Sequence, residues 1–150
     1  MNPPIPPPVI AAIAGAIMWA MNQTLAFGKI EFVLQEVAAL VLLALGLLLM
    51  AVAAGQFIAA RTTINPLRPL RASSLVTTGV FAISRNPIYL ADLLILAALA
   101  VWLGNIINIA LLPLFAWVIN RYQIIPEERA LAQLFGTDYD AYCSRVRRWL

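Results

Sequence analysis

The sequence predicts an all-α integral membrane protein with about four transmembrane helices and a cytoplasmic helical tail. Its 150 residues are 63% hydrophobic and 11% charged, whereas soluble domains are roughly 45–50% apolar and about 25% charged. A soluble fold of this size cannot bury so much apolar surface. The apolar residues also form runs near the length of about 20 residues that a spanning helix needs. We therefore expect a single membrane domain over residues 1–150.

Two apolar runs precede the polar centre of the chain. The first predicted span, 9–27, follows a proline-rich lead, and the second, 37–60, has Gln56 as its only strongly polar residue. The first 28 residues carry no charged side chain, so they lack the basic region of a secretory signal and are interpreted as a retained span. The polar segment 61–87 that follows is expected in the cytoplasm.

The apolar stretch 88–125 is either one long span or a tight helical hairpin. Basic residues cluster on both sides of it, and the positive-inside rule places both clusters in the cytoplasm. This requires two crossings, 88–103 and 106–125, with a turn at Gly104-Asn105. Lys29 is then the only basic residue outside, out of a total of 10. We expect both termini in the cytoplasm and the protein in a bacterial inner membrane.

The tail, 126–150, is predicted to contain two short helices. Pro126 suits the first turn of a helix and Gly136 suits its end. The sequence Thr137-Asp-Tyr-Asp140 has the spacing of a capping box and predicts the start of the second helix. The end of the tail is interpreted as an interfacial anchor, because it combines cations with an aromatic residue: Arg145, Arg147, Arg148 and Trp149.

Composition excludes several classes of function. The net charge of +3 is small and the basic residues do not gather on a soluble face, so we expect no nucleic acid partner. Without histidine, neither a histidine metal site nor a histidine base is available. The nucleotide-binding glycine motifs and C-x-x-C are also absent. We expect no metal and no obligate protein partner besides the lipid bilayer.

Two polar clusters stand where apolar spans begin or end. Arg85, Tyr89 and Asp92 are spaced i, i+4 and i+7, so they share one helix face. They are either topological markers or a functional site, and Asp92 favours a site because ionisable groups at membrane depth usually face a cavity or partner. The second cluster, Glu127-Glu128, serves either the positive end of a helix or a ligand.

Three motifs follow one another in the second half of the chain: Leu75-Val-Thr-Thr-Gly79, then Ser84-Arg-Asn-Pro-Ile-Tyr89, then Glu127-Glu-Arg-Ala-Leu131 with Phe135-Gly136, Tyr139, Tyr142 and Arg147-Arg-Trp149. Together they resemble the isoprenylcysteine carboxyl methyltransferase family, which also includes membrane phospholipid methyltransferases. The resemblance covers roughly residues 55–150.

The resemblance implies a multispanning enzyme that moves a methyl group from S-adenosyl-L-methionine, without a metal, to a lipophilic acceptor in the membrane. The product of the cofactor is S-adenosyl-L-homocysteine. Glu127 would be the cofactor-binding carboxylate. The remaining cofactor-binding residues implied by the resemblance are Ser73, Ser74, Leu75, Val76, Gly79, Phe81, Arg85, Asn86, Pro87, Ile88 and Tyr89.

The sequence departs from the family at the places where chemistry is expected. Asn86 stands where many members have histidine, and it keeps hydrogen bonding while losing proton transfer. Gln123 stands where the eukaryotic prenyl-protein enzymes have a substrate-binding arginine, so Arg121 is the candidate substitute. Asp92 and Glu128 are the candidates to take a proton from an amine acceptor. Arg121, Asp92 and Glu128 are thus the predicted catalytic residues.

The leading interpretation is methyl transfer to a membrane-partitioned acceptor, with a carboxylate favoured because it is already ionised. One alternative is a phospholipid N-methyltransferase. An alternative of another class is a non-catalytic four-span transporter or assembly protein. A transporter is expected to carry polar residues deep in several spans, whereas here they gather at the cytoplasmic ends. We also expect the acceptor to arrive from the bilayer between the second span and the hairpin.

Overall fold

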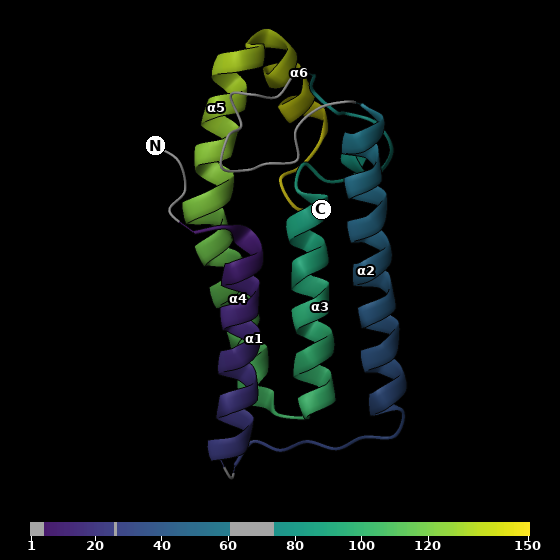
Figure 1. Cartoon of the computed structure of the whole chain (residues 1–150), viewed down its shortest axis with the longest axis vertical. Helices are drawn as coiled ribbons and strands as arrows, with labels where there is room; N and C mark the ends of the chain where they lie inside the picture. Colours follow the sequence, from purple (N-terminus) through teal and green to yellow (C-terminus); the bar gives the residue numbers. More distant parts are fainter. Residues whose placement is uncertain (1–4, 26, 61–73) are drawn as a thin grey trace.

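The structure is a computed structural model that describes residues 5–25, 27–60 and 74–150 (Figure 1). The described residues form helices and loops, with one isolated bridge between Lys29 and Asn105. This confirms the predicted all-α class. In chain order the helices are α1 (Pro7–Thr24), α2 (Gln35–Ala59), the 3-10 helix η2 (Gly79–Ala82), α3 (Pro87–Leu103), α4 (Ile106–Ile119), the π-helical segment η3 (Asn120–Ile124), α5 (Ile125–Phe135) and α6 (Thr137–Arg145).

Helix α3 is the centre of the bundle. It packs against α1, α2 and α4, and in Figure 1 it runs between α1 and α2. The core that joins these helices contains side chains from α1, α3 and α4, among them Met18, Leu96, Phe115 and Ile119. The end of α2 and the tail helices α5 and α6 lie at the same end of the molecule (Figure 1).

Within the described residues, two helices are long and apolar enough to cross a membrane: α2 and the continuous helix Ile106–Phe135, with mean hydropathies of 2.9 and 1.3. Only 17% and 22% of their apolar windows are buried, whereas the core helix of a soluble protein is mostly buried. Large apolar side chains such as Leu40, Leu47 and Leu48 face outward, which suits lipid. Helix α3 is apolar but shorter, and the count of four spans stays a prediction.

The predicted turn of the hairpin is confirmed. Helix α3 ends at Leu103 and α4 begins at Ile106, and between them Gly104 takes a left-handed conformation with φ of 59° that glycine adopts without steric cost. The side chain of Asn105 caps α4 by accepting a 3.0 Å hydrogen bond from the backbone N–H of Ile107. The Ile30 N–H donates to the Gly104 carbonyl at 2.7 Å, which fastens the loop before α2 to this turn.

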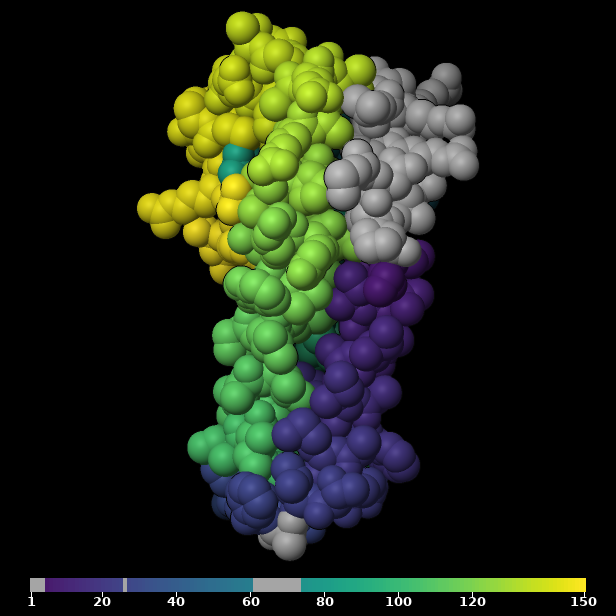
Figure 2. Space-filling model, turned by 90° about the vertical axis from the view of Figure 1, so that its left-hand side faces the viewer, coloured from purple at the N-terminus to yellow at the C-terminus, as the bar shows by residue number. Residues whose placement is uncertain are grey.

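The predicted break before Pro126 is absent. Helices α4, η3 and α5 form one continuous helix, and Figure 2 shows it as a green ridge along the molecule beside α1. The N–H of Ile125 donates to the carbonyl of Asn120, five residues back. Proline lacks an N–H and collides with the carbonyl four residues earlier in an ordinary helix. The wider π turn immediately before Pro126 gives it room.

The tail turns where the sequence predicted. Helix α5 ends at Phe135, and Gly136, with φ of 51°, separates it from α6. The predicted capping box is wrong: Gly136 occupies the N-cap position, Thr137 is already inside the helix, and no side chain caps it. Tyr139 and Tyr142 lie buried on one face of α6, in a small core with Val146.

Candidate functional site

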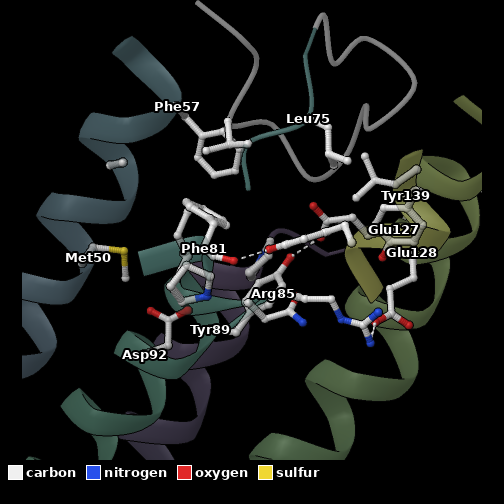
Figure 3. Close-up of a pocket in the computed structure, with 18 of the residues that line it drawn as sticks. Met50, Phe57, Leu75, Phe81, Arg85, Tyr89, Asp92, Glu127, Glu128 and Tyr139 are labelled. Atoms are coloured by element: carbon white, nitrogen blue, oxygen red, sulfur yellow. Dashed lines mark hydrogen bonds and ion pairs between the residues drawn. The ribbon is translucent and has the colours of Figure 1, made fainter. Parts of the chain in front are cut away.

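A pocket of about 330 Å³ lies where α2, the segment before α3 and the tail helices meet (Figure 3). Its volume is within the range of roughly 300–1,000 Å³ that is usual for ligand sites. Its apolar lining includes Met50 and Phe57 of α2, Phe81 of η2 and Leu131 of α5. The charged residues of the lining come from the loop before α3, from α3 itself and from α5: Arg85, Asp92, Glu127 and Glu128.

Tyr89 and Glu127 meet inside this pocket. Tyr89 lies in the first turn of α3 and Glu127 in the first turn of α5, and the tyrosine hydroxyl donates a 3.0 Å hydrogen bond to Oε2 of the carboxylate. Tyr89 is buried, with 6% of its surface exposed. Because the bond uses one oxygen of Glu127, the other oxygen can accept hydrogen bonds from a ligand.

Glu128 is held by two arginines. Arg85 Nη2 lies 3.0 Å from Oε1 of Glu128. Arg148 grips the same carboxylate with two bonds, from Nη2 to Oε2 at 2.7 Å and from Nε to Oε1 at 3.0 Å. These bonds raise the pKa of Arg148. Arg148, which the sequence analysis assigned to an interfacial anchor, is thus bound to the tail helix α5 by a bidentate contact with a carboxylate.

The C-terminal segment also braces the loop before α3. The Arg85 N–H donates to the carbonyl of Arg147 at 3.0 Å. The side-chain amide of Asn86 donates to the backbone carbonyl of Arg148 at 2.9 Å. Trp149, the aromatic residue of the expected anchor, packs against the bundle core. The loop that carries Arg85 and Asn86 is thereby fixed from the far end of the chain.

Phe81 is positioned from both sides. Its backbone carbonyl accepts a 2.6 Å hydrogen bond from the hydroxyl of Tyr142 in α6. Its ring meets that of Phe57 in α2 edge to face, with centroids 4.9 Å apart. Burial raises the pKa of Tyr142 to about 12 and raises the pKa of Tyr139 as well, since the charged phenolate loses its hydration. Both phenols therefore stay neutral donors at physiological pH.

Most residues that the resemblance assigned to the cofactor line this pocket: Ser74, Leu75, Val76, Phe81, Arg85, Asn86, Pro87, Ile88, Tyr89 and Glu127. Gly79 is outside the lining. Its φ is +59°, and a Cβ there would collide with the side chain of Gln56, so it permits a close approach to α2. Ser73 lies outside the described residues.

The three predicted catalytic residues are placed differently. Asp92 and Glu128 line the pocket, although Glu128 is already engaged by two cations. Arg121 does not line it: the side chain is exposed on η3 and its guanidinium lies 5.9 Å from the centre of the Tyr122 ring. Arg121 thus lies on the outer surface of the helix and does not contact the pocket in which a substrate would bind.

Sequence reasoning missed the contribution of α1 and α2. Met50, Ala54 and Phe57 of α2 line the pocket, together with Pro7 and Pro8 at the start of α1. The α2 residues are spaced i, i+4 and i+7, the same one-face spacing that singled out Arg85, Tyr89 and Asp92. The spacing is visible in the sequence, but three apolar residues on one face of an apolar span do not stand out from their neighbours.

The fold and the site define a helical membrane protein with a ligand pocket at one end of its bundle. The sequence profile of the phospholipid methyltransferase family matches residues 34–138, which is most of the chain. The chain belongs to this family. It is therefore a membrane methyltransferase by family, which sets aside the transporter and assembly alternatives.

Two relatives carry local similarity. An uncharacterized protein of Haemophilus influenzae is 47% identical over 62 residues, which are 41% of this chain and 98% of that protein. The protein-S-isoprenylcysteine O-methyltransferase of Schizosaccharomyces pombe is 32% identical over 72 residues, which are 48% of this chain and 30% of that enzyme. The chain thus matches less than a third of the Schizosaccharomyces pombe enzyme.

Proposed function

We propose that the protein transfers a methyl group from S-adenosyl-L-methionine to a lipophilic acceptor at the cytoplasmic face of a bacterial inner membrane. The observation that carries the proposal is the pocket in which Tyr89 holds Glu127 among apolar lining residues from α2, η2 and α5. The family match supports methyl transfer in general. The identity of the cofactor and the lipophilic nature of the acceptor are the parts of the proposal that go beyond the family match.

The residues of the pocket suit this cofactor. An adenine ring needs flat apolar surfaces, and Phe57, Phe81 and Leu131 offer them. Ribose hydroxyls need an acceptor, and Glu127 keeps one carboxylate oxygen free of the Tyr89 bond. The amino-acid end of the cofactor needs a cation for its carboxylate, and the buried Nε of Arg85 has no hydrogen-bond partner among the described residues.

When bound, the cofactor supplies an electrophilic methyl group on a positively charged sulfur. The protein then has to hold the acceptor in line with that group and keep water away. The braced loop at Arg85 and Asn86 and the docked tail provide rigid walls for this purpose. No cluster of three or more acidic, cysteine or histidine side chains that could hold a metal occurs in the described part of the chain.

A label-transfer assay tests the proposal. The detergent-solubilised protein is incubated with methyl-tritiated S-adenosyl-L-methionine and three acceptors in turn: a bacterial lipid extract, an S-prenylated cysteine and a long-chain amine. We expect label in the organic phase with the wild type and at least about tenfold less with Glu127→Gln, because the lost bond involves a charged group.

Glu31→Gln is the matched control, since Glu31 is exposed and does not line the pocket. It should transfer label at the rate of the wild type. The proposal fails if no acceptor becomes labelled, or if Glu127→Gln and Glu31→Gln are equally active.

A further inference from the structure

The start of α1 lies against the continuous helix Ile106–Phe135. Figure 1 and Figure 2 both show it, in purple, beside the green helix. Two residues of this start, Pro7 and Pro8, line the pocket described above. The segment 5–8, which we call the proline segment, therefore supplies part of the pocket wall from a part of the sequence far from Glu127.

The proline segment has few hydrogen-bond donors of its own. Pro6, Pro7 and Pro8 have no backbone N–H, so this stretch of backbone can accept hydrogen bonds but cannot donate them. The next two donors, the N–H groups of Val9 and Ile10, both bond to the carbonyl of Pro6, at 3.0 and 3.3 Å, within the first turn of α1. A donor that holds these prolines against the neighbouring helix must therefore come from outside them.

Gln123 provides such a donor. Its side-chain Nε2 donates to the backbone carbonyl of Ile5 at 2.6 Å, across 118 positions of the sequence. Gln123 belongs to η3 and is 1% exposed. The next residue, Ile124, is fully buried in the same core as Met18 of α1. This face of η3 is therefore turned toward α1, and the amide of Gln123 reaches the proline segment directly.

The helix face that carries Gln123 also carries Glu127. The two residues are spaced i and i+4, and residues at that spacing are neighbours on a helix surface. Gln123 is not part of the pocket lining, so it acts on a ligand only through the segment that it holds. Its bond to Ile5 thus fixes where Pro7 stands relative to the carboxylate of Glu127.

The proline segment is stiff enough for one bond to position it. Pro6 has φ of −61° and ψ of 139°, close to the polyproline II conformation. Proline-rich chains of this kind behave as semi-rigid spacers. Fixing the carbonyl of Ile5 therefore also fixes the rings of Pro7 and Pro8, and the ring of Pro7 is buried.

We propose that Gln123 is a positioning residue for the pocket: it anchors the proline segment, so that Pro7 and Pro8 form a fixed part of the wall around the bound cofactor. This inference rests on the proposed function and adds a residue to it. A wall that is fixed before the ligand arrives does not have to be ordered on binding. Without the anchor, the proline segment moves away from the wall and the ligand loses contacts.

Hydrogen exchange tests the anchor without a ligand. The backbone amides of Val9 and Ile10 are followed by nuclear magnetic resonance, with the whole chain in detergent micelles. Gln123→Met keeps the size of the side chain and removes its donor. We expect these two amides to exchange at least about fivefold faster than in the wild type, the scale of one net hydrogen bond. Amides in the middle of α2 should keep their exchange rates.

Tyr122→Met is the matched control, because Tyr122 is exposed on the same π-helical segment and does not line the pocket. It should leave the exchange of Val9 and Ile10 unchanged. Gln123→Asn is a second variant, which keeps the amide but is one methylene too short to reach the carbonyl, and it should behave like Gln123→Met. The inference is overturned if the folded Gln123 variants exchange like the wild type, or if Tyr122→Met accelerates exchange equally.

The wild type gives a test that needs no substitution. Because the proline segment forms part of the wall around the ligand, saturating S-adenosyl-L-homocysteine should slow the exchange of Val9 and Ile10 at least about threefold. Bound ligand that leaves both amides unchanged would overturn the proposed contact between the ligand and this wall.

A double-mutant cycle tests whether Gln123 acts on the ligand through the wall. Gln123→Met should weaken binding of S-adenosyl-L-homocysteine at least about threefold, as measured by calorimetry. Replacing both Pro7 and Pro8 by alanine removes the rings that the anchor positions. In that background Gln123→Met should weaken binding less than about twofold, since coupled residues are not additive. Equal effects in both backgrounds would overturn the inference.

Two combinations of results separate this inference from the proposed function. Faster exchange in the Gln123 variants, without binding of S-adenosyl-L-homocysteine to the wild type, supports the anchor and overturns the proposed methyl transfer. Binding of S-adenosyl-L-homocysteine to the wild type, with unchanged exchange in the Gln123 variants, overturns the anchor alone.

Discussion

The Tyr89 hydroxyl and the Glu127 carboxylate, 38 residues apart in the chain, form a 3.0 Å hydrogen bond across the pocket. The bond joins the first turn of α3 to the first turn of α5. Helix α5, which carries Glu127 in its first turn, begins directly after the π-helical segment η3, so the register of that segment decides which way the carboxylate points. An extra residue in a helical turn rotates everything after it, and such π bulges are frequent at functional sites.

Replacing Tyr89 by phenylalanine tests what this bond does. Tyr89→Phe keeps the ring and removes the donor, so Glu127 loses its orientation. We expect affinity for S-adenosyl-L-homocysteine to fall by roughly 1 kcal/mol, the scale of one net hydrogen bond, while the melting temperature changes little. Calorimetry in detergent measures the affinity, and a thermal melt measures the melting temperature. Unchanged affinity would mean that Glu127 is positioned without Tyr89.

Arg147 and Arg148 are adjacent in the chain but make different contacts, so comparing them tests whether the contacts of Arg148 stabilise the tail. Arg148 is bonded to Glu128 and to Asn120, whereas the exposed Arg147 contributes its backbone carbonyl. Arg148→Ala should cost about 1 kcal/mol of unfolding free energy, a modest figure because its side chain is 37% exposed and water screens the pair.

Arg147→Ala is the matched control for Arg148→Ala, and it should stay within about 0.5 kcal/mol of the wild type. Unfolding of both variants in detergent, followed by circular dichroism, makes the comparison. Equal stability of the two variants would mean that the contacts of Arg148 do not fasten the tail.

The docking of the tail should weaken in alkaline solution. The pKa of Tyr142 is raised from 10.0 to about 12 by burial, so the folded state favours the neutral phenol. Its contribution is fully present below pH 10 and is lost as the pH rises through about 12. Tyr142→Phe cannot ionise there, so its stability should fall less steeply than that of the wild type over this interval. Parallel curves in a pH-dependent melt would contradict the assignment.

The topology has a direct test. Phe57 near the end of α2 and Tyr139 of the tail line one pocket, so both must lie on the same side of the membrane. The distribution of basic residues predicts that this side is the cytoplasm. Reporter fusions after Ala60 and after Leu150 should both give a cytoplasmic signal. Opposite signals from the two fusions would take Glu127 away from Arg85 and break the site apart.

The elements that sequence predicted best are those fixed by local chemistry. The turn at Gly104-Asn105 was predictable because glycine, a capping asparagine and the charge distribution all pointed to one place. The break at Gly136 was predictable for the same kind of reason. The set around Tyr89 was found because polar residues at helical spacing are rare in an apolar span.

What sequence could not predict depends on contacts between distant segments. Pro126 was interpreted as a helix start because local patterns do not reveal a π turn that accommodates proline within a helix. Arg148 was assigned to the membrane surface because its partner, Glu128, lies 20 residues away. Arg121 was placed near the substrate by its position in the motif, but the turn of η3 directs it outward.

The central claim is that this pocket binds the methyl donor, and the most direct measurement is isothermal titration calorimetry with S-adenosyl-L-homocysteine. We predict saturable binding to the wild type with one site per chain. Glu127→Gln should keep its fold but lose about 1.5–3 kcal/mol of affinity, the scale of a hydrogen bond to a charged group. No binding to the folded wild-type protein, or equal binding to both proteins, would contradict the account.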